Sequence, residues 1–262
     1  MRDYLDLDTY PIDEPGSELY MALVKRCQDD LVNKGMFNLD GLLLPNACQK
    51  AVDEINPVMQ NASFTHRREH NIYFLKDIPE LDPDHPALRK VETINHTVCA
   101  DQILDSIVVK VYEYEPLIRF IANTMKKPRL FTMPDPLARV NVMAYRDGEA
   151  LNWHFDRSEF TTTLLLQNPK AGGLFEYRND LRSESNPNYE GVARLLNNGD
   201  SQRQSIQACA GTLTVFRGKN TAHRVTPIEG NKERIVTVYS YYEQPDRYFS
   251  EDELFGFFGR SH

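Results

Sequence analysis

The chain has 262 residues, of which 41% are hydrophobic and 26% are charged, a balance typical of a globular protein with a substantial core. Its formal net charge of −8 and its pI near 5.4 argue against the basic surface that nucleic-acid binding normally requires. No apolar run approaches the roughly 18 residues of a membrane span, and the acidic residues 1–6 do not resemble a signal peptide. We therefore expect a cytoplasmic protein with neither a membrane span nor a nucleic-acid partner.

The four cysteines are scattered along the chain. Cys27, Cys48, Cys99 and Cys209 form no CxxC pair, which disfavours a zinc site made of thiolates. Disulfides are rare in a reducing compartment. We expect all four to be free thiols.

The first half of the chain is expected to be mainly helical. Apolar residues at spacings of three and four predict a helix from Ser17, its N-cap, to Gly35, its stop. A second helix is predicted over residues 47–59 with Asn46 as its cap. Residues 71–75 are expected to form a strand, and residues 89–125 to be helical with a break at Pro116.

The second half of the chain reads as a series of short strands. Alternating or β-branched runs occupy residues 139–145, 160–166, 172–177, 211–216, 223–225 and 234–242. Strands at this spacing, with turn signals between them, suggest a sandwich or barrel. The polar stretch 179–207, with a short helix at 192–196, is long enough to be a lid or binding loop. The aromatic tail, residues 246–262, could serve core packing or a homodimer contact.

Two ligand-type residues stand at strand spacing in the second half. His154 and Asp156 are two positions apart, so on a strand both side chains would point to the same side. His223 could complete a set of two imidazoles and one carboxylate, which is the facial triad of non-haem Fe(II) oxygenases. Arg234 follows within the next strand, and a buried guanidinium there would need an anionic partner such as a ligand carboxylate.

In the order and spacing of these parts, the chain resembles the Fe(II)/2-oxoglutarate-dependent oxygenases over residues 139–242. The resemblance implies an α+β fold, with a double-stranded β-helix (a jelly-roll, cupin-like core) buttressed by N-terminal helices. It implies Fe(II) held by His154, Asp156 and His223, and a 2-oxoglutarate carboxylate held by Arg234. Tyr145 and Thr163 are expected to contact 2-oxoglutarate, and O₂ is the second co-substrate.

The resemblance also implies how the chain is organised. We expect one oxygenase domain over residues 1–262. Residues 1–130 would supply mainly helical support and substrate loops, residues 131–245 the jelly-roll core with the lid-like insert 179–207, and residues 246–262 a C-terminal tail.

The run His154-Phe155-Asp156-Arg157-Ser158-Glu159 and the strand after it resemble a smaller group that acts on free amino acids. That group contains hydroxylases and radical halogenases, and the halogenases have Gly or Ala in place of the carboxylate ligand. Because Asp156 is present here, the resemblance implies hydroxylation, with release of succinate and CO₂. Desaturation, epimerisation or ring formation by the same chemistry stays open.

A zwitterionic amino acid needs a cation for its carboxylate and polar groups for its ammonium. Candidates for the cation lie upstream of the metal motif: Arg89, Arg67, Arg68, His66 and His70. Candidates for polar or stacking contacts flank the motif: Asn152, Trp153 and Glu159. The pair His66 and His70 lacks a third metal ligand nearby, so we favour a surface or pocket role for it over a metal role.

The motif is compatible with three other interpretations. The triad could consist of satisfied polar residues in an ordinary β-sandwich, or the chain could be a jelly roll that binds a ligand without turnover. A zinc hydrolase would need a general base, for which Glu159 is the nearby candidate, but it leaves Arg234 without a purpose.

Overall fold

The first helix has the ends that its sequence predicts. In the computed structural model, which describes all 262 residues, α1 (Glu18–Lys34) begins where the Ser17 side chain accepts a hydrogen bond from the Tyr20 N–H. It ends at Gly35, whose φ of 73° lies in the left-handed region that favours glycine. The predicted first helix is therefore confirmed.

The second helix begins earlier than expected. α2 (Pro45–Ala62) starts with Pro45 in its first turn, and its N-cap, Leu44, makes no side-chain hydrogen bond. The expected cap at Asn46 is wrong because proline, with its fixed φ and missing N–H, is well suited to the first helical position.

Two strands replace expected features in the first half. β2 (Phe64–His70) lies just before residues 71–75, where we expected a strand and where Asn71 instead anchors a turn. β3 (Val91–Cys99) occupies the start of the region expected to be helical, residues 89–125. Its sequence alternates between two faces with a period of two, and the helical spacing begins only after it.

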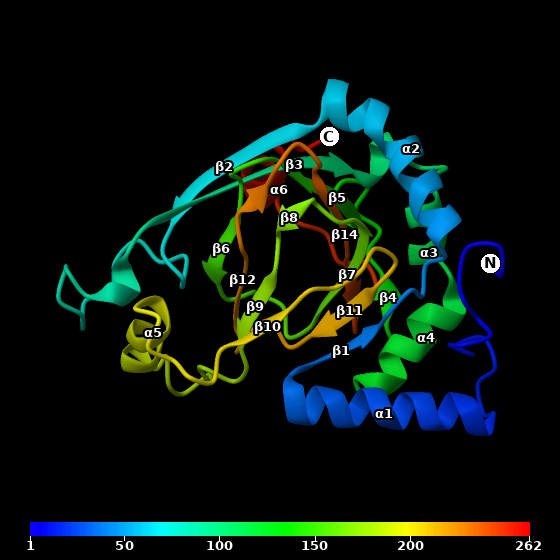
Figure 1. Cartoon of the computed structure of the whole chain (residues 1–262), viewed down its shortest axis with the longest axis horizontal. Coiled ribbons are helices and arrows are strands. Elements are labelled where there is room, and N and C mark those ends of the chain that lie inside the picture. The colour runs from blue at the N-terminus through cyan, green and yellow to red at the C-terminus, as the bar shows by residue number, and fades with distance from the viewer.

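The expected break at Pro116 is confirmed. α3 (Ile107–Tyr112) ends just before α4 (Glu115–Thr124), which carries Pro116 in its first turn. These two helices, together with α1 and α2, lie on one side of the sheets (Figure 1).

Two facing antiparallel sheets form the jelly roll. The larger has the order β1-β11-β7-β14-β5-β3-β2 and the smaller β10-β9-β12-β6. The remaining strands of the larger sheet are β1 (Met36–Leu39), β5 (Val140–Tyr145), β7 (Thr161–Gln167), β11 (Leu213–Phe216) and β14 (Arg234–Tyr239). Those of the smaller sheet are β6 (Leu151–His154), β9 (Phe175–Arg178), β10 (Gln204–Ile206) and β12 (Ala222–Val225).

Short elements connect these sheets. Two small pairs of strands are β8 (Ala171–Gly172) with β13 (Ile228–Glu229), and β4 (Phe131–Thr132) with β15 (Tyr241–Tyr242). Two 3₁₀ turns are η1 (Pro86–Leu88) and η2 (Ala100–Gln102).

The two faces of the larger sheet pack against different partners. Residues such as Val142, Leu164 and Ile235 face the helices and belong to a core cluster of 40 buried residues. Their neighbours Tyr145 and Val236 face the smaller sheet, where they pack with residues such as Val225. The space between the sheets is therefore the interior of the jelly roll.

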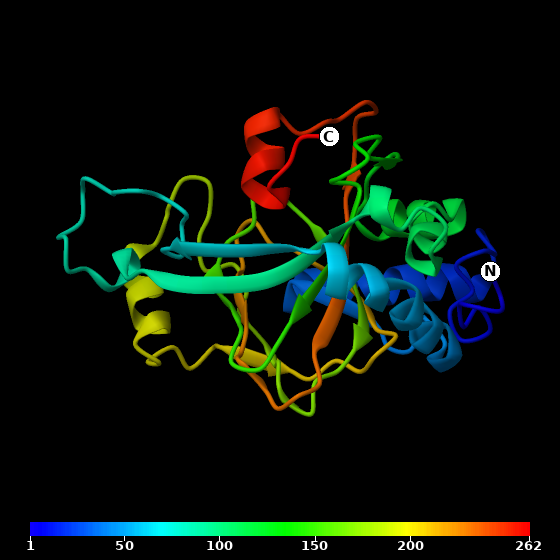
Figure 2. The ribbon, with the colours of Figure 1, turned by 90° about the horizontal axis from the view of Figure 1, so that it is seen from above.

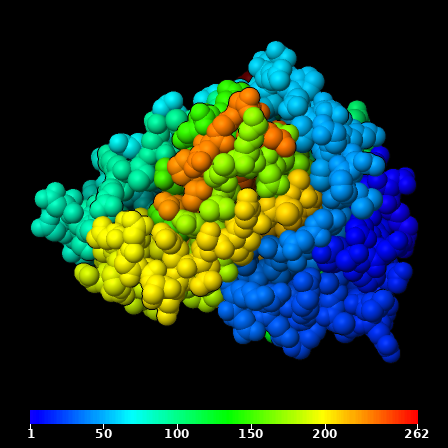
Figure 3. All heavy atoms as spheres, in the orientation of Figure 1, coloured from blue at the N-terminus to red at the C-terminus, as the bar shows by residue number.

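The polar insert 179–207 contains the expected helix as α5 (Tyr189–Leu196). A separate cluster packs this insert against the loop that contains η1 and against Trp153 and Phe155, which flank His154. Figure 3 shows the insert (yellow) and that loop (teal) side by side on one flank of the molecule. The insert thus supports the strand that carries the first candidate ligand.

The aromatic tail forms α6 (Glu251–Phe258), which lies to one side of β2 and β3 in Figure 2. Leu254 and Phe258 pack with Cys99, Met133 and Leu137 of the same chain, so the tail contributes to core packing. All four cysteines are free, and only Cys209 is exposed. None of the helices is both long enough and apolar enough to cross a membrane.

Candidate metal centre and active site

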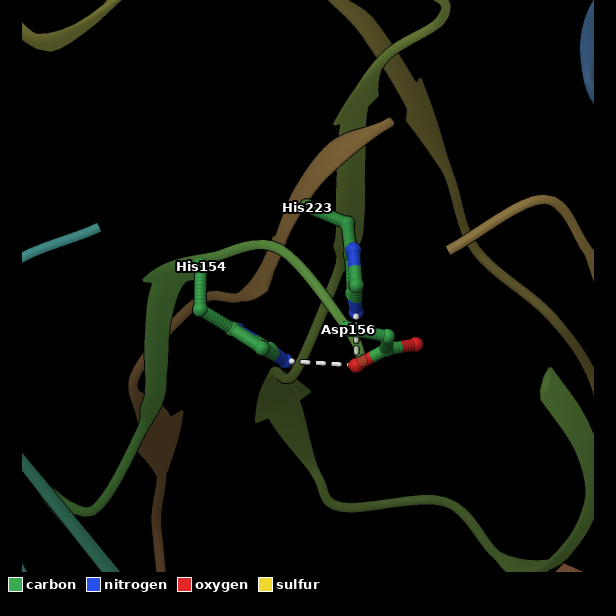
Figure 4. Close-up of side chains that lie close together, drawn as sticks. All are labelled: His154, Asp156 and His223. Carbon is green, nitrogen blue, oxygen red and sulfur yellow. Dashed lines mark ion pairs between the residues drawn. The ribbon is translucent and has the colours of Figure 1, made fainter. Parts of the chain in front are cut away.

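The three candidate ligands meet at one end of the smaller sheet. His154 is the last residue of β6, His223 lies opposite it in the register of β12, and Asp156 follows in the loop after β6. Figure 4 shows the three side chains converging, with one Asp156 oxygen between the two imidazoles. No other cluster of three or more ligand-type side chains with metal-binding spacing occurs in the chain.

The separations of the ligand atoms fit one metal ion. The Asp156 Oδ1 atom is 3.4 Å from His154 Nε2 and 3.5 Å from His223 Nε2, and all three atoms lie within 4.8 Å of one another. Ligand atoms about 2.1 Å from a metal and at right angles to each other would be about 3 Å apart. If the three ligand atoms moved slightly closer together, they would therefore form a facial triad around one metal ion.

Backbone carbonyls orient both imidazoles. His154 Nδ1 lies 2.8 Å from the Asn152 carbonyl oxygen, and His223 Nδ1 lies 3.0 Å from the Thr221 carbonyl oxygen. Each Nδ1–H donates to its carbonyl, which leaves each Nε2 with a lone pair directed at the metal position.

The charges of the three groups are coupled. Burial, followed by the neighbouring His223, lowers the pKa of His154. Burial also opposes charging of His223, but the Asp156 carboxylate outweighs it and raises the pKa of His223. For Asp156, burial is outweighed by the two imidazoles, which hold its pKa well below the ordinary value. The site therefore holds an ionised carboxylate, the form that binds a metal.

The second oxygen of the carboxylate has a partner of its own. Thr161, at the start of β7, donates a hydrogen bond of 2.6 Å to Asp156 Oδ2. Oδ1 is thereby left for the metal. Sequence reasoning missed Thr161, although it singled out Thr163 on the same strand.

Arg234 and Tyr145 lie opposite each other on neighbouring strands, and both face the interior of the jelly roll. Arg234 is only 9% exposed, and its guanidinium makes no hydrogen bond or ion pair within the chain. Burial lowers its pKa and raises that of Tyr145 to about 12. Because a buried cation without a partner is costly, this position fits the carboxylate of a bound ligand.

Thr163 lies on the same interior face. It pairs with Val238 and Thr214 across the sheet, and its hydroxyl makes no hydrogen bond within the chain. The structure therefore brings Arg234 and Tyr145 together, whereas Thr163 lies opposite Val238, four residues along β14 from Arg234. The roles of all three residues stay predictions.

Four of the residues expected to bind the substrate are instead engaged in contacts with other parts of the chain. Trp153 lies in the cluster beneath α5, with the Arg224 guanidinium 5.0 Å from its ring centre. Asn152 donates to the Glu92 carbonyl oxygen, so it ties β6 to β3. Arg89 donates a hydrogen bond to the Asn197 side chain, and Glu159 forms an ion pair with Lys127.

His70 is buried and contacts Thr93 of the neighbouring strand β3. Its Nδ1 donates to the Asn71 carbonyl oxygen, and its Nε2 lies 2.9 Å from Thr93 Oγ1. The same Thr93 oxygen accepts a hydrogen bond from the Asn152 N–H. Burial lowers the pKa of His70, so it acts as a neutral link to the ligand-bearing strand, with both of its nitrogens occupied.

Arg68 is an upstream cation whose aromatic neighbour contacts the candidate metal ligand His154. The register of β2 with β3 puts Arg68 on the interior side, whereas Arg67 points away and pairs with Glu92. The Arg68 guanidinium stacks 4.5 Å from the centre of the Phe74 ring, which in turn lies 5.8 Å from the His154 ring. Arg68 is exposed, and it makes no hydrogen bond or ion pair within the chain.

Sequence reasoning did not single out Phe74. Its φ of 56° is unusual for an aromatic residue, and the Asn71 side chain holds the turn by bonding the N–H groups of Tyr73 and Leu75. No sequence signal marked Phe74 as part of the site, because its placement depends on this turn.

Comparison with known proteins agrees with this arrangement. The sequence profile "HalD: Halogenase D" matches residues 20–252, which is most of the chain. The chain belongs to the halogenase D family. No curated protein matches it by sequence.

Solved structures with the same fold cover most of this halogenase D family member. One is an oxidoreductase of the 2OG-Fe(II) oxygenase family from Burkholderia pseudomallei, with 14% identity, a TM-score of 0.51 and coverage of 88% of this chain and 93% of that one. Another is a Pseudomonas putida prolyl-4-hydroxylase, with 12% identity, a TM-score of 0.51 and coverage of 83% and 98%. A third is the epimerase SnoN in complex with Fe3+, alpha ketoglutarate and nogalamycin RO, with 12% identity, a TM-score of 0.55 and coverage of 84% of both chains.

The fold expected from the sequence is thereby confirmed, because the chain shares its fold with a solved 2OG-Fe(II) oxygenase family member and with a prolyl-4-hydroxylase. Fe(II), 2-oxoglutarate and O₂ are the cofactor and co-substrates that the sequence resemblance implies. The residues present fit them, because two oriented imidazoles and one ionised carboxylate suit Fe(II). The unpartnered Arg234 suits a carboxylate of 2-oxoglutarate.

Proposed function

We propose that this halogenase D family member hydroxylates an unactivated C–H bond of a small carboxylate-bearing substrate, a free amino acid. The observation that carries the proposal is the Asp156 carboxylate, placed between two imidazoles at 3.4 Å and 3.5 Å. A carboxylate at this position occupies the place that a halide ligand would need. Hydroxylation is therefore favoured over halogenation.

His154, Asp156 and His223 would hold Fe(II) on one side and leave its other side open. When bound, Fe(II) couples the oxidative decarboxylation of 2-oxoglutarate by O₂ to the oxidation of a substrate C–H bond. Arg234 would hold a carboxylate of 2-oxoglutarate, with Tyr145 opposite it and Thr163 further along the same interior face. The chain's own residues thus supply orientation and charge.

Arg68 is the residue that we assign to the substrate carboxylate. It has no partner in the chain, and Phe74 separates its guanidinium from His154 by one aromatic ring. Partial burial lowers the pKa of Arg68, and the positive charge of Arg157, directly after Asp156, lowers it further. A substrate anion held there would place its carbon chain over Phe74, close to the metal position.

The expected test is a panel of free L-amino acids. The protein would be reconstituted without oxygen with Fe(II) and 2-oxoglutarate and then exposed to O₂. We expect one amino acid to stimulate succinate formation and to gain one oxygen atom. No stimulation by any member of the panel would contradict the free-amino-acid proposal.

The role of Arg68 has a matched control in its neighbour. We expect Arg68→Gln to raise the KM for the substrate roughly ten- to hundredfold, since a charge-assisted hydrogen bond is worth about 1.5–3 kcal/mol. Arg67→Gln should leave it unchanged, because Arg67 points away and pairs with Glu92. Equal KM values for the two variants would show that Arg68 does not bind the substrate.

The same centre could also serve desaturation or cyclisation, because these reactions begin with the same hydrogen abstraction. A jelly roll that binds a ligand without turnover is the alternative from another class. The panel separates them, since desaturation removes two hydrogens and a binding protein forms no succinate above background.

A further inference from the structure

Asp156 lies against a residue that has no side chain. Gly218 belongs to the loop that leads into β12, and its carbonyl oxygen accepts a hydrogen bond of 3.1 Å from the Asp156 N–H. A Cβ added at Gly218 would lie 2.8 Å from both Cβ and Cγ of Asp156 and would overlap its Oδ2 atom. Separations below about 3 Å between such carbon atoms do not occur in unstrained packing.

Rotation of the carboxylate cannot relieve this contact. The Asp156 Cβ is as close to the added atom as Cγ is, so turning the carboxylate about its own axis leaves the overlap. The backbone hydrogen bond between the two residues also keeps the two segments together. The space occupied by the carboxylate therefore depends on glycine at position 218.

Thr161 binds the same carboxylate oxygen that faces Gly218. Its hydroxyl donates to Oδ2 at 2.6 Å, while Oδ1 lies between His154 and His223. One oxygen is thus fixed by the protein and the other is presented to the metal position. Partners of this kind orient a metal-ligating carboxylate.

We propose that Gly218 and Thr161 form a seat for the Asp156 carboxylate, with Gly218 providing its space and Thr161 selecting the oxygen that faces the metal. Both are positioning residues, because they act through Asp156. The seat joins two segments that are distant in sequence, since Asp156 and Thr161 lie in the short stretch between β6 and the start of β7, whereas Gly218 precedes β12. The inference rests on the proposed ligand role of Asp156, but its steric part holds in the metal-free protein.

The space provided by Gly218 is tested by thermal melting of the metal-free protein. We expect Gly218→Ala to lower the Tm by roughly 3–10 °C, as overpacking does in a chain of this size. In an Asp156→Gly background the same substitution should change the Tm by less than about 2 °C, because the clashing carboxylate is gone. Equal losses in the two backgrounds would overturn this part of the proposal, whatever reaction the enzyme performs.

The role of Thr161 is tested by titration with Co(II) as a probe of the metal site. We expect Thr161→Val to weaken Co(II) binding roughly 10- to 100-fold, the usual cost of losing a partner of a metal ligand. Thr161→Ser, which keeps the hydroxyl, should restore it to within about threefold of the original affinity.

Thr162→Val is the matched control, because Thr162 is the next residue of β7 and lies on the opposite face of the sheet. It should leave Co(II) affinity unchanged. If Thr161→Val binds Co(II) as tightly as Thr162→Val, Thr161 does not orient the ligand.

Discussion

Asp156 lies between two imidazoles whose pKa values move in opposite directions. The pKa of His154 is lowered, with burial as the largest cause, whereas the Asp156 carboxylate raises that of His223 against the effect of burial. In the metal-free protein, His223 is therefore the imidazole that binds a proton more readily, and it then pairs with the ionised Asp156 carboxylate. A metal ion must displace that proton in order to bind.

This displacement predicts how metal affinity depends on pH. A raised pKa means that His223 holds its proton up to a pH above the ordinary value of 6.5. Metal affinity should be constant above that raised pKa and should fall by about tenfold per pH unit below it, one proton being released per ion. Anaerobic Fe(II) titrations over a pH series measure this, and an affinity that stays flat to about pH 6 would contradict it.

Arg234 gives a second prediction for a single residue. Its buried guanidinium has no partner in the chain, so its removal should cost 2-oxoglutarate binding and leave the metal ligands in place. We expect Arg234→Gln to raise the KM for 2-oxoglutarate roughly 10- to 100-fold, the value of one charge-assisted hydrogen-bond partner.

The control for Arg234 is Arg146→Gln. Arg146 is partly exposed at the end of β5 and pairs with Glu233, so its loss should not change the KM for 2-oxoglutarate. Comparable KM values for the two variants would exclude Arg234 as the co-substrate anchor.

Among the larger elements, α5 supports the ligand-bearing strand β6. Leu195 of α5 is 1% exposed and belongs to the cluster that holds Trp153 and Phe155 on either side of His154. The insert that carries α5 is therefore more than a surface connection. It anchors the back of the strand whose last residue is a candidate metal ligand.

This arrangement predicts that a cavity created in α5 also destabilises β6. We expect Leu195→Ala to lower the free energy of unfolding by about 2–5 kcal/mol and to speed hydrogen exchange of the amides of β6. The control is Arg194→Ala on the exposed side of the helix, which should do neither. Faster exchange confined to α5, with β6 unchanged, would contradict the supporting role.

At the scale of the whole molecule, the second half of the chain was more predictable than the first. Strands such as residues 139–145 alternate clearly, and their turns carry glycine, so the sheet positions follow from local pattern. β3 was expected to be helical because apolar residues follow it at helical spacing. Its pairing with β2 and β5 is a long-range contact that local spacing does not reveal.

The metal site was predictable because its residue types are rare and their order is informative. The seat around Asp156 was not, since a glycine that leaves space and a threonine that donates one hydrogen bond carry no chemical signature of their own. The candidate substrate residues were hard to choose for a related reason, and their roles stay predictions. Arg67 and Arg68 are adjacent and of the same type, so the sequence alone does not distinguish them. The register of β2 with β3 shows that Arg67 points away from the interior and pairs with Glu92, whereas Arg68 lies on the interior side.

The packing role of the aromatic tail also follows only from the three-dimensional structure. Leu254 and Phe258 pack within their own chain, while Phe255 is 54% exposed. A homodimer stays a prediction.

The most direct test of the account is the product formed with Fe(II), 2-oxoglutarate, isotopically heavy O₂ and chloride present together. We expect the substrate to gain one labelled oxygen and no chlorine, with one succinate formed per turnover, and we expect Asp156→Gly to abolish this hydroxylation. A chlorinated product from the unaltered protein, or full hydroxylation by Asp156→Gly, would contradict the claim that Asp156 is a metal ligand that makes this family member a hydroxylase.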